Sequence, residues 1–291
     1  MEPPVNPLSR HAKNVHSQFG EDGILEAIFS TLGVERGMCV EFGAWDGIYL
    51  SNTYNLISNK GWGGVLIEGD SKRAEVLKAN MRRFKDVHCV NRFITFGPPS
   101  NLDAILATTP LPKDFNLLSI DIDGNDYHIW KSLKNYRPQV VIIEYNQTIP
   151  NHVVFVQPSD FAVNQGSSLR AFVELGKEKG YELVATTTTN AIFVLAELFP
   201  KFGITDNRPD VMRTDTEHLT YLYQLYDGTL KLAGCDRMVW SGVEMREGRI
   251  QMVPAPLRDL VAIPAQKSWF YKISFSIWLR IYRLLYAKVV G

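Results

Sequence analysis

The stretch Met38-Cys39-Val40-Glu41-Phe42-Gly43-Ala44-Trp45-Asp46-Gly47 decides the fold of this chain. It has the pattern of a buried strand, residues 38–42, that carries an acidic residue and runs into a glycine turn. A second apolar run, Val65-Leu66-Ile67, ends in Glu68-Gly69-Asp70. Glycine lets the backbone turn sharply and approach a ligand, and a carboxylate at the next strand tip can accept hydrogen bonds from both hydroxyls of a ribose. The two strand ends therefore predict a nucleoside-binding crevice in an α/β fold.

The glycine spacing indicates which nucleotide cofactor fits this crevice. The pattern E-x-G-x-x-x-G from Glu41 to Gly47 differs from the dinucleotide pattern G-x-G-x-x-G. It suits S-adenosylmethionine better than NAD, because this cofactor has no pyrophosphate that needs a helix N-terminus. Glu68 is expected to bind the ribose, whereas Asp70 is expected to cap the next helix. We expect the cofactor to be bound by Gln18, Glu41, Gly43, Ala44, Asp46, Glu68, Asn91 and Asp121.

Composition places the chain among ordinary globular proteins. Its 291 residues are 45% hydrophobic and 21% charged, enough for one full α/β domain with an extension. Because 31 basic residues balance 31 acidic ones, the overall charge does not attract nucleic acid. Cys39, Cys89 and Cys235 are far apart, which argues against a disulfide framework and for a reducing cytoplasm. The first 20 residues lack the apolar core of a secretory peptide, and no long apolar run predicts an ordinary transmembrane helix.

Strands and helices alternate along most of the chain. The first predicted helix, 18–33, has apolar residues at helical spacing and ends at Gly33. The predicted strands are 38–42, 64–68, 87–91, 115–121 and 140–145, and the predicted helices between them are 51–59, 71–84, 101–107 and 127–134. This alternation, with uninterrupted apolar strands, predicts a parallel sheet that is covered on both faces.

The last strands and the remaining chain define the fold class. After a helix at 167–179, strands 181–186 and 191–195 are joined so briefly that they must be antiparallel neighbours. Five parallel strands followed by one antiparallel hairpin form the seven-stranded, Rossmann-like sheet of class I methyltransferases. We expect a methyltransferase domain at 1–205, a β-rich or irregular appendage at 206–266 and a basic amphipathic helix at 267–291. In the appendage, strand-like runs occur at 221–223, 239–240 and 249–253.

Acidic residues gather at the ends of the fourth and fifth strands. Asp121, Asp123 and Asp126 repel one another unless a cation or a proton separates them. Because these two strands are expected to be adjacent, the sequence predicts a Mg²⁺ site whose ligands come from Asp121, Asp123, Glu144 and Asn146. The alternative is that the acids cap the following helix and that Asp-Gly is turn chemistry.

Five ordered motifs resemble those of FkbM-type S-adenosylmethionine-dependent methyltransferases. They are Ser17–Asp22, Val40–Ala44, Ile67–Asp70, Ser119–Gly124 and Gly166–Leu169, within residues 16–196. The resemblance implies O-methylation, often of a sugar hydroxyl in a glycan or glycosylated natural product, so a carbohydrate or glycoconjugate is the expected partner.

The segment Ile122–Tyr127 is also similar to the I-D-G-D segment of metal-dependent macrocin-type sugar O-methyltransferases. That similarity implies that the first Asp binds Mg²⁺ and that a nearby acid or histidine is the general base. Those enzymes end strand five with a paired acid, whereas this chain has Glu144-Tyr145-Asn146. A metal site here would therefore be weaker or differently built.

Methyl transfer to a hydroxyl requires an oxygen aligned with the sulfonium methyl and a group that removes its proton. Asp126, which follows Asp123 by three residues, is the first candidate for this base, and His128 and His152 are further candidates. Each histidine, taken singly, also suits a structural role.

The C-terminal segment 268–290 predicts one helix with Lys272, Ser276, Arg280, Arg283 and Ala287 on a narrow face and apolar side chains elsewhere. Such a helix suits a membrane interface, at the inner face if the protein is cytoplasmic, or docking on the body or on a second subunit. A methyltransferase-like module without catalysis, tethered through this helix, is the alternative to an enzyme. A nicotinamide oxidoreductase is the third reading, and the glycine spacing disfavours it.

Overall fold

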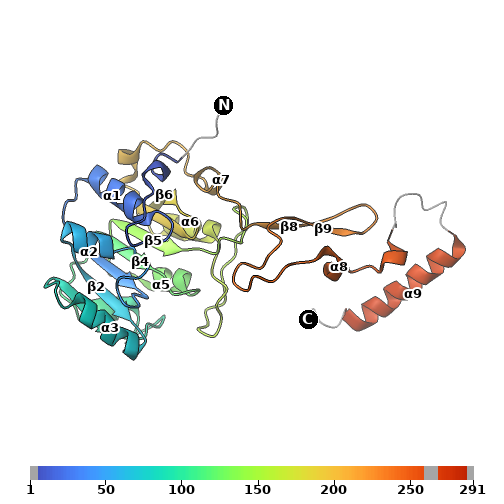
Figure 1. Cartoon of the computed structure of the whole chain (residues 1–291), viewed down its shortest axis with the longest axis horizontal. Helices are drawn as coiled ribbons and strands as arrows, with labels where there is room; N and C mark the ends of the chain where they lie inside the picture. The colour runs from blue at the N-terminus through green and yellow to red at the C-terminus, as the bar shows by residue number, and fades with distance from the viewer. Residues whose placement is uncertain (1–5, 259–267, 287–291) are drawn as a thin grey trace. The chain divides into compact units, whose positions relative to one another are not determined.

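The computed structural model describes residues 6–258 and 268–286, which belong to two units (Figure 1). The sheet unit is Met1–Asp215, and the C-terminal unit is Thr216–Gly291. In the sheet unit, seven strands form one sheet in the order β3-β2-β1-β4-β5-β7-β6. Their bounds are β1 Met38–Phe42, β2 Gly63–Glu68, β3 Val87–Asn91, β4 Leu117–Ile120, β5 Val140–Glu144, β6 Tyr181–Thr186 and β7 Asn190–Leu195.

Strand direction confirms the predicted fold class. Strands β1 to β5 pair in parallel, whereas β7 is antiparallel to both β5 and β6. The strand order reverses between β1 and β4, and ligands of open α/β sheets bind where this happens, at the carboxyl ends of the strands.

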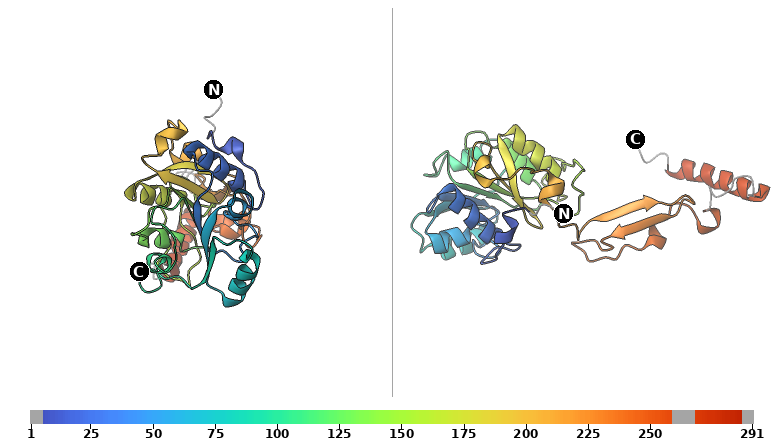
Figure 2. Two further views of the ribbon diagram at one scale, coloured as in Figure 1. Left: turned by 90° about the vertical axis from the view of Figure 1, so that its left-hand side faces the viewer. Right: turned by 90° about the horizontal axis from the view of Figure 1, so that it is seen from above.

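Helices cover the sheet on both faces, and each face has its own apolar core (Figure 2). On one side lie α1 Glu21–Leu32, α2 Tyr54–Lys60 and α3 Ser71–Met81; on the other lie α4 Leu102–Leu106, α5 Asp126–Ser132 and α6 Leu169–Glu178. Shorter helices are η1 Ser9–His11, η2 Phe199–Phe202 and α7 Pro209–Met212. Because successive strand residues point to opposite faces, Val40 enters one core and Cys39 the other.

Local chemistry explains where the helices begin. Asp70 caps α3 as predicted, since its side chain accepts the N–H of Arg73 at 2.9 Å. The helix predicted from Ser51 begins instead at Tyr54. Residues 51–53 donate their hydrogen bonds to the carboxylate of Glu41 and form a loop. Because these three residues bind the buried Glu41 of β1, helix α2 begins three residues later than predicted.

The boundary of the sheet unit lies ten residues beyond the predicted end at 205, after Asp215. Helix α7 and Arg213 belong to this unit because they bind the loop that follows β5. The Arg213 guanidinium donates to the carbonyl oxygens of Ile149 at 2.9 Å and of Gln147, and to Asn151 Oδ1 at 3.2 Å. The structure also groups the predicted appendage and the C-terminal helix into one unit.

The C-terminal unit contains a hairpin and helices with little apolar core. Its elements are β8 Thr220–Gln224, β9 Leu230–Gly234, α8 Glu247–Ile250, η3 Ala255–Leu257 and α9 Trp269–Tyr286. The expected strand at 221–223 lies in β8, but those at 239–240 and 249–253 are wrong, since 239–240 form a turn and Arg249 lies in α8. The end of the predicted helix beyond residue 286 lies outside the described residues.

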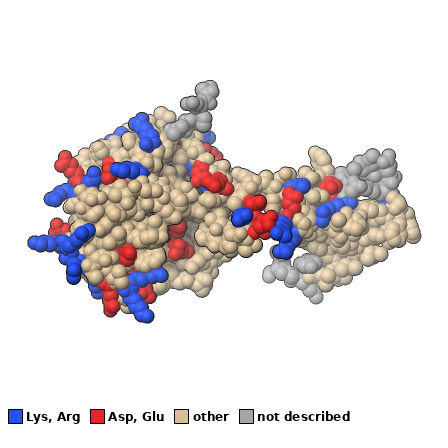
Figure 3. Space-filling model, viewed as in Figure 1, with Lys and Arg blue, Asp and Glu red and all other residues tan. Residues whose placement is uncertain are grey.

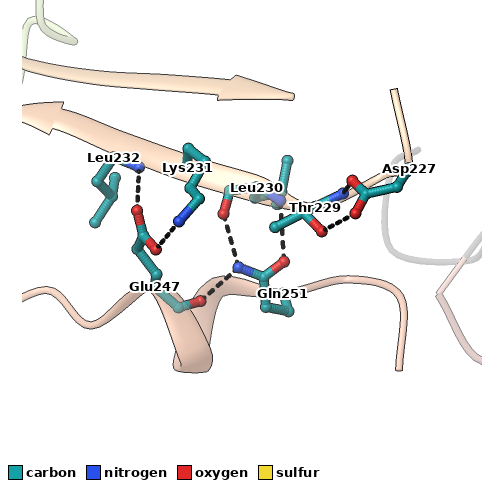
Figure 4. Close-up of polar contacts among 7 residues, drawn as sticks. All are labelled: Asp227, Thr229, Leu230, Lys231, Leu232, Glu247 and Gln251. Carbon is teal, nitrogen blue, oxygen red and sulfur yellow. Dashed lines mark hydrogen bonds and ion pairs between the residues drawn. The ribbon is translucent and has the colours of Figure 1, made fainter. Parts of the chain in front are cut away.

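Polar contacts hold α8 on the hairpin (Figure 4). The Gln251 side chain exchanges two hydrogen bonds with the backbone of Leu230, at 2.9 and 2.8 Å. Glu247 pairs with Lys231 at 2.8 Å. Among the described residues of this unit, only Leu219 is a fully buried apolar side chain. The unit therefore presents much of its apolar surface to solvent.

Candidate functional site

A cavity of about 820 Å³ lies at the carboxyl ends of the central strands. The glycine turn after β1, the tip of β2 and the acidic tips of β4 and β5 line it. The structure thereby brings together many of the residues predicted from sequence: Gln18, Glu41, Gly43, Ala44, Glu68, Asp121, Asp123 and Glu144.

Gly43 allows the tips of β1 and β4 to come close together. Its φ is +78°, a left-handed conformation that favours glycine. A Cβ at this position would lie 1.9 Å from the carbonyl oxygen of Asp121. The N–H groups of Gly43 and Ala44 both bind the carbonyl oxygen of Ile67, at 3.2 and 3.1 Å. The turn is therefore fixed against β2 and β4 at the floor of the cavity.

Glu68 is held rigidly at the tip of β2. One carboxylate oxygen accepts the N–H of Trp45 at 2.9 Å, and the other accepts the N–H of Asp70 at 2.8 Å. The side chain is 7% exposed and lines the cavity. Because each carboxylate oxygen can accept more than one hydrogen bond, both can still accept from a ligand. Two adjacent hydroxyls would meet a carboxylate that is already oriented.

Glu41 lies in the same cavity wall, but its carboxylate oxygens form hydrogen bonds within the protein. They accept hydrogen bonds from the hydroxyls of Ser51 and Thr53 at 2.6 and 2.8 Å, and from the N–H of Asn52 at 2.9 Å. Burial raises the pKa of Glu41 to about 7, against the opposing effect of these hydrogen bonds, and Asp121 raises it further. The carboxylate therefore anchors the loop that borders the cavity.

Asp121, Asp123 and Glu144 form an acidic group, in which one carboxylate oxygen from each residue lies within 4.8 Å of the other two. Asp121 and Asp123 are exposed to the cavity, and Glu144 is half-buried. Desolvation by the surrounding protein raises the pKa of Asp121 to about 6, with a further contribution from repulsion by Asp123. Burial also raises the pKa of Glu144, as does the charge of Asp121. Close carboxylates that resist joint ionisation, with oxygen ligands from two strands, fit a hard divalent cation such as Mg²⁺.

Asp126 and His128, two of the candidate bases, lie outside the cavity lining. Asp126 is 2% exposed, and its carboxylate accepts the N–H groups of Ile122 and Gly124 at 3.0 and 2.9 Å. Burial raises its pKa to about 7. The ring of His128 hydrogen bonds to the carbonyl oxygen of Gln157 at 2.8 Å. Asp126 therefore supports the acidic turn after β4, residues 121–126, and His128 binds the loop between β5 and α6.

Asn146 and His152 also lie outside the cavity lining. The Asn146 amide donates to the carbonyl oxygen of Gln165 at 2.7 Å, and its oxygen accepts the N–H and hydroxyl of Thr148. The side chain thus organises the loop after β5 and does not join the acidic group. His152 is exposed on the same loop. The structure does not bring either residue to the proposed reacting groups.

Asp46 and Asn91 support the cavity wall without lining it. Asp46 Oδ1 accepts the N–H groups of Ile48 and Tyr49 at 2.9 and 2.8 Å. The Asn91 amide donates to the carbonyl oxygen of Glu68 at 2.9 Å, and its oxygen accepts the hydroxyl of Ser71 at 3.1 Å. Both side chains hold the backbone around the cofactor residues expected from sequence.

Sequence reasoning missed Glu21 and an aromatic rim. Glu21 lines the cavity and is bound by the Thr187 hydroxyl at 2.6 Å, the Asn190 amide at 3.1 Å and the Phe19 N–H at 2.7 Å. The motif Ser17–Asp22 was the available signal for it. The rim consists of the exposed rings of Trp45, Tyr49, Phe93 and Phe161. The two rings after β1 stack edge to face at 5.4 Å.

The loop between β5 and α6 brings Phe161 and Asn164 to the cavity. Phe155 and Ser168 close this loop through reciprocal hydrogen bonds at 3.0 and 2.9 Å. Asn125, in the acidic turn, donates to the carbonyl oxygen of Asp160 at 3.1 Å. This hydrogen bond joins the loop to the acidic turn at the cavity wall.

The strand order and direction, with the glycine turn after β1, decide the fold assignment. The sheet unit has a class I methyltransferase fold. Comparison of the sequence with protein-family models gave no match, and comparison with curated proteins gave none.

Among solved structures, the chain is similar to an S-adenosylmethionine-dependent methyltransferase from Clostridium acetobutylicum, with 8% identity, a TM-score of 0.41 and coverage of 60% of this chain and 90% of that one. It is also similar to a putative O-methyltransferase from Klebsiella pneumoniae, with 17% identity, a TM-score of 0.41 and coverage of 66% and 91%. A third is M. capricolum TrmK in complex with S-adenosyl-homocysteine, with 9% identity, a TM-score of 0.35 and coverage of 58% and 66%.

Proposed function

We propose that the protein is an S-adenosylmethionine-dependent O-methyltransferase that acts on a sugar hydroxyl of a glycan or its activated precursor, with assistance from Mg²⁺. One observation carries the proposal: the oriented carboxylate of Glu68 and the acidic group Asp121, Asp123 and Glu144 line the same cavity. The first suits the ribose of the cofactor, and the second suits an acceptor hydroxyl whose proton must leave.

Glu68 would accept the two ribose hydroxyls, and the Gly43 turn would let the cofactor approach the backbone. The exposed ring of Phe93 lines the same cavity and lies close to Gly69, the residue after Glu68, since a Cβ on Gly69 would lie 3.3 Å from this ring. A flat apolar surface of this kind suits the adenine base. These contacts would hold the sulfonium end toward the tips of β1 and β4.

At the acidic group, the acceptor oxygen would attack the sulfonium methyl in line. A bond forms between that oxygen and the methyl carbon, the carbon–sulfur bond breaks, and its electron pair stays on sulfur in S-adenosylhomocysteine. A divalent cation held by Asp121, Asp123 and Glu144 would lower the pKa of the acceptor hydroxyl. The released proton would pass to a carboxylate of the same group, of which Asp123 is exposed to the cavity.

The lining of the remaining cavity supports a sugar acceptor. Exposed aromatic rings offer flat surfaces for the C–H faces of a sugar ring, and Gln18, Asn164 and Thr189 offer hydrogen-bonding groups in the same cavity. The resemblance to FkbM-type methyltransferases points to the same substrate class.

Glu68→Ala is expected to weaken S-adenosylhomocysteine binding by about 1–3 kcal/mol, because a charged acceptor of hydrogen bonds is lost. This corresponds to roughly a 5- to 150-fold higher Kd by isothermal calorimetry. Glu75→Ala, an exposed acid on α3 outside the cavity lining, is the matched control and should bind like the wild type. Wild-type affinity in Glu68→Ala would refute the ribose assignment.

Calorimetry with NAD and an activity assay separate the alternatives. The proposal expects S-adenosylhomocysteine to bind and NAD not to bind. Incubation with radiolabelled S-adenosylmethionine and a panel of bacterial and eukaryotic glycans should label a carbohydrate. Cofactor binding without transfer to any carbohydrate would favour the methyltransferase-like binding module instead.

A further inference from the structure

Helix α9 carries a continuous stripe of exposed apolar side chains. Phe270, Ile273, Ile277, Ile281 and Leu284 follow one another at intervals of three or four residues and so share one face of the helix. Their exposed fractions are 73%, 37%, 53%, 50% and 76%. In Figure 3, most of the visible surface of α9 carries neither acidic nor basic side chains. An apolar stripe of this length in water calls for a partner.

A second strip of α9 is basic. Lys272, Arg280 and Arg283 are exposed, fall on one side of the helix next to the apolar stripe, and have no acidic residue among them in Trp269–Tyr286. Within the residues that the structure describes, no carboxylate forms an ion pair with these three side chains. The partner of the apolar stripe should therefore also carry negative charge.

The third side of α9 faces its own unit. The Tyr271 hydroxyl donates to the carbonyl oxygen of Leu257 at 2.6 Å. Phe275, Trp278 and Tyr282 are only partly exposed, and their rings lie against one another at 5.5 and 5.3 Å. Because this side contacts the unit, the apolar stripe and the basic strip remain available to another surface.

The length and apolar character of a helix determine whether it can span a bilayer or only lie on its surface. Over residues 6–258 and 268–286, no helix is both long enough and apolar enough to cross a membrane. A helix with an apolar stripe beside a basic strip lies instead in the plane of the headgroups, with the stripe among the acyl chains and the bases near lipid phosphates.

We propose that α9 binds an anionic membrane surface and lies in its plane, with the Phe270–Leu284 stripe inserted. Charge favours this partner over a second copy of the chain. Two α9 helices packed stripe to stripe would bring the three bases of each copy together in an antiparallel pair, and in either orientation neither helix offers an acid to neutralise them. Anionic lipid neutralises the same bases.

Full-length protein tests the proposal by sedimentation with vesicles of phosphatidylcholine containing about one third phosphatidylserine. We expect co-sedimentation, and release at high salt or with pure phosphatidylcholine, because the attraction between bases and the surface is screened. Arg280→Gln with Arg283→Gln should weaken binding by about 10- to 30-fold, since each base near such a surface contributes on the order of 1 kcal/mol. Arg249→Gln, an exposed base on α8, is the matched control and should bind like the wild type.

Ile277→Ser with Ile281→Ser tests the apolar stripe separately. This variant keeps every charge, so it should still be attracted at low salt but lose most of its binding at moderate salt. Circular dichroism checks that it is folded. Binding equal to wild type would overturn the insertion of the stripe. A variant that turns an oligomer into a monomer, in a protein that ignores anionic vesicles, would identify a subunit contact and overturn the membrane proposal. These vesicle experiments do not depend on cofactor binding, so failure of the membrane proposal can be distinguished from failure of the proposed function.

Discussion

Replacing Arg213 by Met is expected to lower the free energy of unfolding of the sheet unit by about 3–5 kcal/mol, because several buried hydrogen-bond acceptors lose their donor. Arg213 is 3% exposed. Its guanidinium binds the carbonyl oxygens of Gln147, Ile149 and Asp215, and it lies over the Tyr145 ring at 5.2 Å. Methionine fills similar space but donates no hydrogen bond, so these carbonyl groups would be buried without partners.

Urea unfolding followed by circular dichroism measures this loss. Arg208→Met is the matched control: its partner Asp206 lies at 2.6 Å, but the Arg208 side chain is 75% exposed. An exposed ion pair contributes little, so this control should lose less than about 1 kcal/mol. Arg213→Lys should fall between the two, because one ammonium cannot reach all the carbonyl groups. If Arg213→Met behaves like the control, the residue does not fasten the loop after β5.

Asp123→Asn and Glu144→Gln are each expected to weaken Mn²⁺ or Mg²⁺ binding by about 100-fold and to abolish the metal dependence of turnover. The reason is that each replaces a charged oxygen ligand by a neutral amide in a group of only three carboxylates. Binding of S-adenosylhomocysteine should persist, because Glu68 lies on a different strand. Water proton relaxation with Mn²⁺ measures the metal directly, without an acceptor.

Thermal unfolding gives a second readout for the acidic group. Without added metal, Asp123→Asn should unfold at a higher temperature than the wild type, because mutual repulsion of the carboxylates is relieved. Added Mg²⁺ should stabilise the wild type but not the variant. Asp114→Asn, an exposed acid before β4, should change neither result. Full activity of the wild type in excess chelator would remove the metal from the mechanism.

The strands of the sheet could be predicted from the sequence because each buried strand is an uninterrupted run of apolar residues. The predicted ranges 38–42 and 87–91 agree with β1 and β3, and the polar link after β6 predicted the antiparallel β7. At the strand tips, Glu68, Asp121 and Glu144 line the cavity, whereas Asn91 at the end of β3 does not. Hydrophobic periodicity and turn residues are local patterns of a few residues, so they can be recognised in a single sequence.

The sequence pattern does not show where a side chain turns when its partners are set by the folded loops. Asp126 turns back to bind the N–H groups of its own loop, and Asn146 binds the loop at Gln165, so neither reaches the acidic group. Spacing along the chain does not reveal which way such a side chain turns. Glu21 was missed because its partners Thr187 and Asn190 lie 166 and 169 residues away.

The long separation between Glu21 and Asn190 has a consequence for how the protein is made. Glu21 is fully buried in the folded protein, where it binds Thr187 in the link after β6 and Asn190 at the start of β7. Ribosomes add roughly 5–20 residues per second, so this carboxylate emerges roughly 10–30 s before its partners. During that interval, Glu21 at the start of α1 lacks the two side chains that bind its carboxylate in the folded protein. A nascent chain that stalls before residue 187 should therefore expose a partly built sheet to chaperones and proteases.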